Sequence, residues 1–216
     1  MSERDPVSEG AREQILRAVR SATLGRREHP GPYVPAPTPP APATGALPGA
    51  WEAFRSAATA AGAHVLGPVS RAEAARAARE RVAQLGSGRC VAEPAAVEML
   101  GAGPWQVAAG APREFADVSL AIARGAFGVC ENGAILLTAD LAPHRSLWVL
   151  CEHLWLLIEA TDLVADMHEA VARISARGLS TPHSVWVAGP SKTADIEQAL
   201  VEGAHGPRSL WVVGVV

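Results

Sequence analysis

Lysine is almost missing from this sequence of 216 residues, which also lacks a surplus of positive charge. Lys192 is the only lysine among 19 basic residues, and the formal net charge is −3. Proteins that bind nucleic acid through phosphates need a basic surface, so no nucleic-acid partner is expected. No run of like charges predicts a tail for another charged surface either.

Cysteine is scarce as well. The three cysteines, Cys90, Cys130 and Cys151, are odd in number and widely spaced, and no CxxC motif occurs. This pattern excludes a disulfide framework and is typical of a reducing compartment. It also lacks the clustered thiolates that hold iron–sulfur clusters, so no such cluster is expected on this chain.

Long hydrophobic runs are absent too. The longest, Leu147–Ala160, is interrupted by Glu152, His153 and Glu159 and is too short to span a bilayer. The first ten residues do not resemble a signal peptide. We therefore expect a cytoplasmic protein without a membrane span.

The composition of the chain divides it into three parts. Residues 1–28 contain an amphipathic helix over 10–24, residues 29–49 form a proline-rich linker, and residues 50–216 form an α/β domain. The segment before the α/β domain is either a tether or carries a helix that docks on a partner or on a second copy, and both alternatives stay open.

Within the domain, apolar periodicity and turn residues predict alternating helices and strands. Helices are predicted at 50–61, 70–84, 94–101, 162–176 and 193–202. Strands are predicted at 64–66, 89–92, 117–121, 134–138, 147–151, 154–158, 184–188 and 209–215. The alternation indicates an α/β fold with a mixed, mostly parallel sheet flanked by helices. Strands 134–138 and 147–151 are joined too closely for a crossover helix, so some antiparallel pairing is expected.

The most informative segment is the polar stretch between the last two predicted strands. Ser191, Lys192 and Thr193 follow one strand and precede a predicted helix, where unpaired N–H groups and the helix dipole favour an anion. A lysine beside two hydroxyls suits a carboxylate or a phosphate. The alternative is that Ser191 or Thr193 only caps the helix.

Further polar residues of this segment are candidates for the same site. Asp195 and Glu197 fall in the first turn of the predicted helix and are candidate acids or bases, although the helix dipole alone favours carboxylates there. His205 and Gly206 are candidate ligand contacts. A helix of ten residues is about 15 Å long, which would place His205 far from Ser191. Gly206 and the proline after it also serve as ordinary helix terminators.

Glu131 lies in a glycine-rich bend between Gly125 and Gly133. There it can act as a nucleophile, a general base or a hydrogen-bond acceptor. The alternative is a turn carboxylate that pairs with Arg124.

A metal site is suggested only weakly. Cys151, Glu152, His153 and His144 fall short of a tetrahedral ligand set, so no metal is predicted.

Three segments resemble a known family: Glu131-Asn132-Gly133, Gly189–Glu197 and Gly203–Pro207. Over residues 50–216 the chain is similar to the LUD domain of LutC/YkgG-type lactate utilization proteins. The resemblance implies a fold similar to the NagB/RpiA/CoA-transferase-like superfamily. It also implies a three-protein system that oxidises L-lactate to pyruvate, in which iron–sulfur oxidoreductase subunits are the partners and carry the clusters.

One tripeptide departs from the family. The chain has Glu131-Asn132-Gly133 where members commonly have Glu-Thr-Gly, and this variant resembles the Glu-Asn-Gly of CoA-transferases. The alternative function is therefore a CoA-transferase-like enzyme with Glu131 as its nucleophile. Whether the chain is itself an enzyme stays open at this stage.

Overall fold

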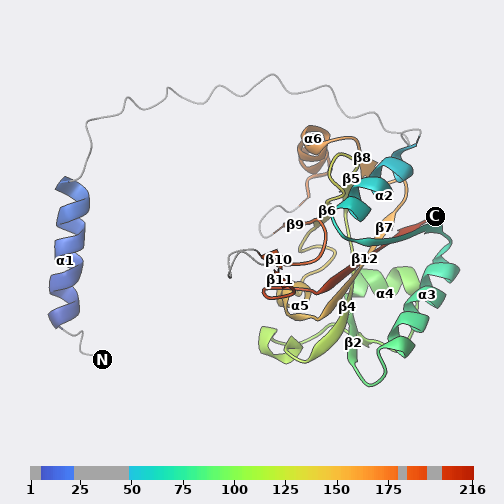
Figure 1. Cartoon of the computed structure of the whole chain (residues 1–216), viewed down its shortest axis with the longest axis horizontal. Coiled ribbons are helices and arrows are strands. Elements are labelled where there is room, and N and C mark those ends of the chain that lie inside the picture. Colours follow the sequence, from blue (N-terminus) through green and yellow to red (C-terminus); the bar gives the residue numbers. More distant parts are fainter. Residues whose placement is uncertain (1–5, 22–48, 180–183, 194–200) are drawn as a thin grey trace. The chain divides into compact units, whose positions relative to one another are not determined.

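Strand β12 (Ser209–Val215) lies inside a sheet of six strands, each parallel to its neighbours. The strand order is β1-β12-β7-β4-β2-β3. The other five strands are β1 (His64–Val69), β2 (Arg89–Ala92), β3 (Gln106–Val107), β4 (Val118–Arg124) and β7 (His153–Glu159). This computed structural model describes residues 6–21, 49–179, 184–193 and 201–216 (Figure 1).

A smaller sheet of four strands has the order β8-β5-β6-β9. Its strands are β5 (Phe127–Val129), β6 (Ile135–Leu137), β8 (Leu163–Val164) and β9 (Val185–Val187). Strand β6 is antiparallel to both β5 and β9, whereas β8 is parallel to β5. A short antiparallel hairpin joins β10 (Lys192–Thr193) to β11 (Val201–Glu202).

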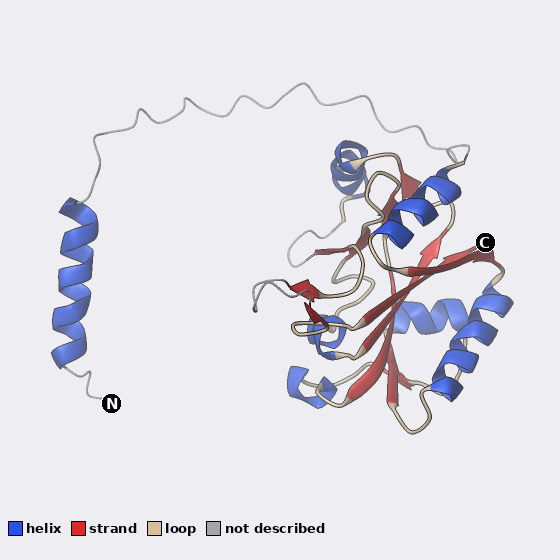
Figure 2. Cartoon of the chain, in the orientation of Figure 1, coloured by secondary structure: helices blue, strands red, loops and turns tan. Residues whose placement is uncertain are grey.

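Both faces of the large sheet are covered (Figure 2). Along β7, Leu154, Leu156 and Ile158 belong to one core cluster, and the intervening Trp155 and Leu157 belong to another. This two-residue alternation is the signature of a strand buried on both faces. The helices are α2 (Ala50–Ala60), α3 (Arg71–Gln84), α4 (Pro94–Leu100), α5 (Arg145–Leu150) and α6 (Met167–Arg177), with a 3-10 turn η1 at Pro112–Phe115.

The predicted α/β class with a mostly parallel sheet is confirmed, but one predicted strand is wrong. Residues 145–150 form helix α5, where a strand was predicted at 147–151. A short apolar run fits a buried helix as well as a strand. Antiparallel pairing does occur, but strand β6 makes it with β5 and β9.

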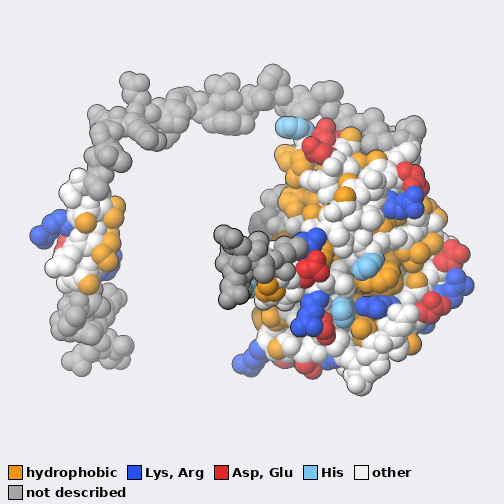
Figure 3. Space-filling model, in the orientation of Figure 1, with side chains coloured by type: hydrophobic (Ala, Val, Ile, Leu, Met, Phe, Trp, Pro, Cys, Tyr) orange, Lys and Arg blue, Asp and Glu red, His pale blue; other side chains and the backbone are white. Residues whose placement is uncertain are grey.

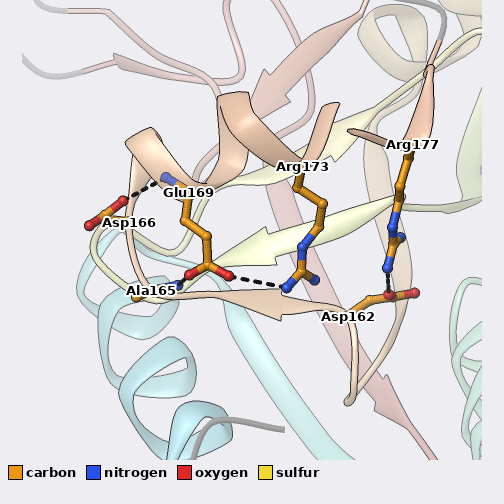
Figure 4. Close-up of polar contacts among 6 residues, drawn as sticks. All are labelled: Asp162, Ala165, Asp166, Glu169, Arg173 and Arg177. Atoms are coloured by element: carbon orange, nitrogen blue, oxygen red, sulfur yellow. Dashed lines mark hydrogen bonds and ion pairs between the residues drawn. The ribbon is translucent and has the colours of Figure 1, made fainter. Parts of the chain in front are cut away.

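Helix α6 begins later than its sequence pattern predicts (Figure 4). Asp166 is the N-cap, and its carboxylate accepts a hydrogen bond of 2.8 Å from the Glu169 backbone N–H. Glu169 in turn pairs with Arg173 at 3.2 Å. Asp162, the first residue of the predicted helix, instead pairs with Arg177 at 2.7 Å. Residues 163–164 are thereby left free to form β8.

The N-terminal helix α1 (Pro6–Ser21) belongs to a separate compact unit, Met1–Thr38. A helix was predicted over 10–24, and Ile15 and Val19 are exposed on α1. The predicted linker lies almost entirely outside the described residues. Among the helices the structure describes, none is both long and apolar enough to cross a membrane.

Candidate functional site

Helix α5 lies where three cavities meet, and Val149 lines all three. Cavity A, of about 430 Å³, is lined by Ser191. Cavity B, of about 600 Å³, is lined by Arg208. Cavity C, of about 450 Å³, is lined by His144. Volumes of this size are typical of small-molecule sites. The helix that the sequence pattern failed to predict therefore contributes to each candidate binding surface.

Cavity A brings Ser191, His205 and Gly206 together. The Ser191 backbone N–H donates to the Pro207 carbonyl at 2.9 Å, and the Gly203 N–H donates to the Ser191 carbonyl at 2.9 Å. These two bonds hold the segment Gly203–Pro207 against Ser191, which lies in the loop after β9. Arg145 and Trp148 of helix α5 also line cavity A.

The predicted helix over 193–202 is wrong at both of its ends. Lys192 and Thr193 pair with Glu202 and Val201 in the β10–β11 hairpin. The chain therefore returns beside its starting point, which removes the 15 Å separation expected for His205. It also removes the argument for an anion at a helix N-terminus, because Thr193 lies in a strand. Asp195 and Glu197 lie outside the described residues.

Lys192 points to a different neighbour. Its ammonium Nζ donates to the Ala61 carbonyl at 3.1 Å, next to the end of α2. Neither Lys192 nor Thr193 contributes to the lining of cavity A. Their predicted ligand contacts stay predictions.

Glu131 lies in the turn after β5, and its side chain is exposed. Its Oε2 accepts a hydrogen bond of 3.2 Å from the Met167 backbone N–H, at the first residue of α6. Arg124, the alternative partner weighed from sequence, pairs instead with Glu159 at 3.7 Å. Glu131 lines none of cavities A, B and C. Its predicted catalytic role stays a prediction.

Cavity B lies at the amino ends of three parallel strands, and His205 and Gly206 border it as well as cavity A. Arg208 pairs with Glu152 at 3.3 Å across its rim. The pair is largely exposed, so it holds the guanidinium only loosely. Arg208 is thus a cation that an incoming anion can recruit.

His153 begins β7 near this rim, and its Nδ1 lies 2.8 Å from the Ser209 hydroxyl. Burial lowers the pKa of His153, and the nearby Arg81 charge lowers it further. The imidazole is therefore neutral at pH 7. Burial also raises the pKa of the Cys151 thiol to about 12, so this cysteine is a neutral thiol at pH 7.

The described part of the chain contains no cluster of three His, Cys, Asp or Glu side chains that could hold a metal ion. The three thiols are free. On the face shown in Figure 3, basic, acidic and histidine side chains intermingle with hydrophobic ones.

Arg145, Trp148 and Arg208 were missed by the sequence analysis. Trp148 lies in the segment predicted as a strand at 147–151, and Arg145 lies two residues before that segment. Arg208 carried a signal, because it directly follows the Gly206-Pro207 motif. An arginine next to a glycine-rich polar loop is a reasonable candidate for an anion contact.

The structure is that of an α/β protein in which polar loops line cavities beside a parallel sheet. A family model for the LUD domain matches residues 106–215, and the chain belongs to this family. Both the predicted family and the predicted fold class are confirmed.

Curated relatives are similar over about half of this chain. Lactate utilization protein C of Oceanobacillus iheyensis is 35% identical over 105 residues, which cover 47% of this chain and 41% of that protein. The uncharacterized protein YkgG of Escherichia coli is 32% identical over 109 residues, covering 48% and 47%. The matched stretch thus spans less than half the length of these relatives.

A solved structure supports the fold. The crystal structure of a DUF162 family protein from Deinococcus radiodurans superposes with a TM-score of 0.57 at 22% identity. The superposition covers 77% of this chain and 96% of that one.

Proposed function

We propose that this chain is a LutC-type component of an L-lactate oxidation system, and that it binds a small anion in cavity A. The observation that carries the proposal is the meeting of Ser191 with His205 and Gly206, which are separated in sequence. A hydroxyl, an imidazole and the Arg145 guanidinium on one lining suit a carboxylate or a phosphate group.

Membership of the LUD family and the names of the curated relatives support the link to lactate. In this proposal the chain works with oxidoreductase subunits that carry the iron–sulfur clusters. Its own three cysteines are free and widely spaced, too few for a cluster ligated by four thiolates.

Ligand binding to the full chain tests the first half of the proposal. Isothermal titration with L-lactate, pyruvate, inorganic phosphate and coenzyme A identifies the anion. Ser191→Ala and His205→Ala should each weaken its binding by about tenfold, the value of a hydrogen bond to a charged group. The matched controls are Ser87→Ala and His168→Ala, at exposed positions outside cavity A. Equal losses in controls and test variants would refute the assignment of cavity A.

Growth and co-purification test the second half. A deletion strain should grow poorly on L-lactate, and the tagged chain should recover proteins with iron–sulfur absorbance. Normal growth together with an empty pull-down would refute the proposed system.

A further inference from the structure

A buried carboxylate lies beneath cavity C. Glu93 follows strand β2, and its side chain has no solvent exposure. Its Oε1 accepts from the His144 backbone N–H at 3.0 Å and from the Trp148 indole N–H at 3.3 Å. Its Oε2 lies 2.8 Å from His144 Nδ1. Three donors satisfy the carboxylate, as burial of such a group requires.

This arrangement determines the tautomer of His144. An ionised carboxylate only accepts hydrogen bonds, so Nδ1 carries the proton that points at Glu93. In the neutral ring, the other nitrogen, Nε2, is then a hydrogen-bond acceptor. Among the described residues, Nε2 has no hydrogen-bond partner. The ring retains 22% of its side-chain exposure and lines cavity C.

The neighbours of His144 supply complementary chemistry. Arg145 and Ser146 line the same cavity, and the Arg145 guanidinium has no ion-pair partner among the described residues. Cavity C thus offers an imidazole nitrogen, a cation and a hydroxyl on three consecutive residues. A ligand that carries a hydroxyl hydrogen next to a carboxylate matches this set.

We propose that cavity C is a second binding site, which recognises the head group of a 2-hydroxycarboxylate. His144 Nε2 accepts the hydrogen bond of the ligand hydroxyl, and Arg145 pairs with the carboxylate. Glu93 is the positioning residue that orients the ring through Nδ1 and leaves Nε2 available to the ligand. The cavity has room for a longer chain beyond the head group. This inference goes beyond the proposed function, because it concerns a different cavity. Arg145 borders both cavities, whereas His144 and Ser146 line cavity C and not cavity A.

The test compares L-lactate with propionate, which lacks the hydroxyl, by titration calorimetry on the full chain. We expect L-lactate to bind about fivefold more tightly, the value of one neutral hydrogen bond. His144→Phe should abolish this preference, whereas His168→Phe at an exposed position of α6 should preserve it. Arg145→Ala should weaken both acids by about tenfold, and Arg113→Ala, an exposed arginine outside the lining, should not.

Glu93→Gln is the sharpest variant. Two donors face Oε1, so the amide oxygen takes that position and the amide NH₂ faces His144 Nδ1. Nδ1 must then accept, and Nε2 becomes a donor. Glu93→Gln should therefore remove the preference for L-lactate while the protein stays folded by circular dichroism.

Two results separate this site from cavity A. A preference that disappears in Ser191→Ala but persists in His144→Phe would place hydroxyl recognition in cavity A and overturn the present inference. A His144 side-chain NMR signal that L-lactate leaves unmoved would overturn it as well. A shift of that signal, with binding unaffected by Ser191→Ala, would support cavity C and refute the assignment of cavity A.

Discussion

Gly206 lies so close to Ser191 that a Cβ atom on the glycine would be 3.2 Å from Ser191 Cβ and 3.4 Å from its hydroxyl oxygen. Backbone hydrogen bonds to Pro207 and Gly203 hold Ser191 in place on both sides. The glycine therefore allows the two loops of cavity A to touch. The close approach gives a physical reason for glycine at this position that does not depend on helix termination.

Gly206→Ala should accordingly disturb cavity A. We expect a loss of about 1 kcal/mol or more in the free energy of unfolding, as for overpacking of a constrained contact. Anion binding should weaken in parallel. Urea unfolding and calorimetry measure the two effects. Gly10→Ala, where nothing lies within 4 Å of the added Cβ, is the control and should leave binding unchanged.

Glu93 should also matter for stability. Glu93→Ala leaves three N–H donors, two of them partly buried and one buried, without their acceptor, which should lower the free energy of unfolding by about 3 kcal/mol. Glu98→Ala, an exposed glutamate of α4, should change it by less than about 0.5 kcal/mol. Chemical denaturation of both variants checks this, and equal stabilities would contradict the role of Glu93 in holding α5.

Alkaline pH should destabilise the fold through Cys151. Its pKa is raised from the usual value of 9.0 to about 12 by burial. The unfolded chain therefore loses the thiol proton first as the pH rises, and stability falls above about pH 9, by up to about 1.4 kcal/mol per pH unit from this group. Denaturation between about pH 8 and pH 10.5 measures the slope. Cys151→Ala should flatten it; an unchanged slope would assign the effect elsewhere.

Glu131→Ala should fray the start of α6, because the carboxylate accepts a bond from the Met167 N–H. The expected cost is about 1 kcal/mol. Native-state hydrogen exchange at Met167 would detect it, with Glu80→Ala, an exposed glutamate of α3, as the control.

Incubation with an acyl-CoA and hydroxylamine tests the alternative function, since a covalent adduct on Glu131 would support a CoA-transferase-like enzyme.

Most of the large sheet could be predicted from sequence because its strands have two-sided apolar patterns and clear turn residues. Helix α3 was equally clear, and Ser70 and Glu73 form its capping box. Helix α5 could not be predicted, because its apolar run is only one or two turns long. Its conformation depends on contacts with distant residues such as Glu93, and local propensity does not encode such contacts.

Three of the candidate residues named from the sequence line cavity A. Ser191, His205 and Gly206 do share a cavity, but the predicted helix between them was expected to keep them apart. That expectation failed because the pairing of Thr193 with Val201 is a tertiary choice that short polar sequences do not reveal. Glu93 gave no signal at all, since a glutamate before a proline is an ordinary helix start.

The position of β12 between β1 and β7 affects how the molecule is made. Strand β1 emerges early from the ribosome, yet the strand it pairs with is synthesised long afterwards. Until then the edges of β1 and β7 stay unpaired and open to wrong partners. The segment Gly203–Pro207 and strand β12 are adjacent in sequence and are synthesised after the other strands of the sheet. A chain that lacks them therefore has neither the complete sheet nor the complete lining of cavity A.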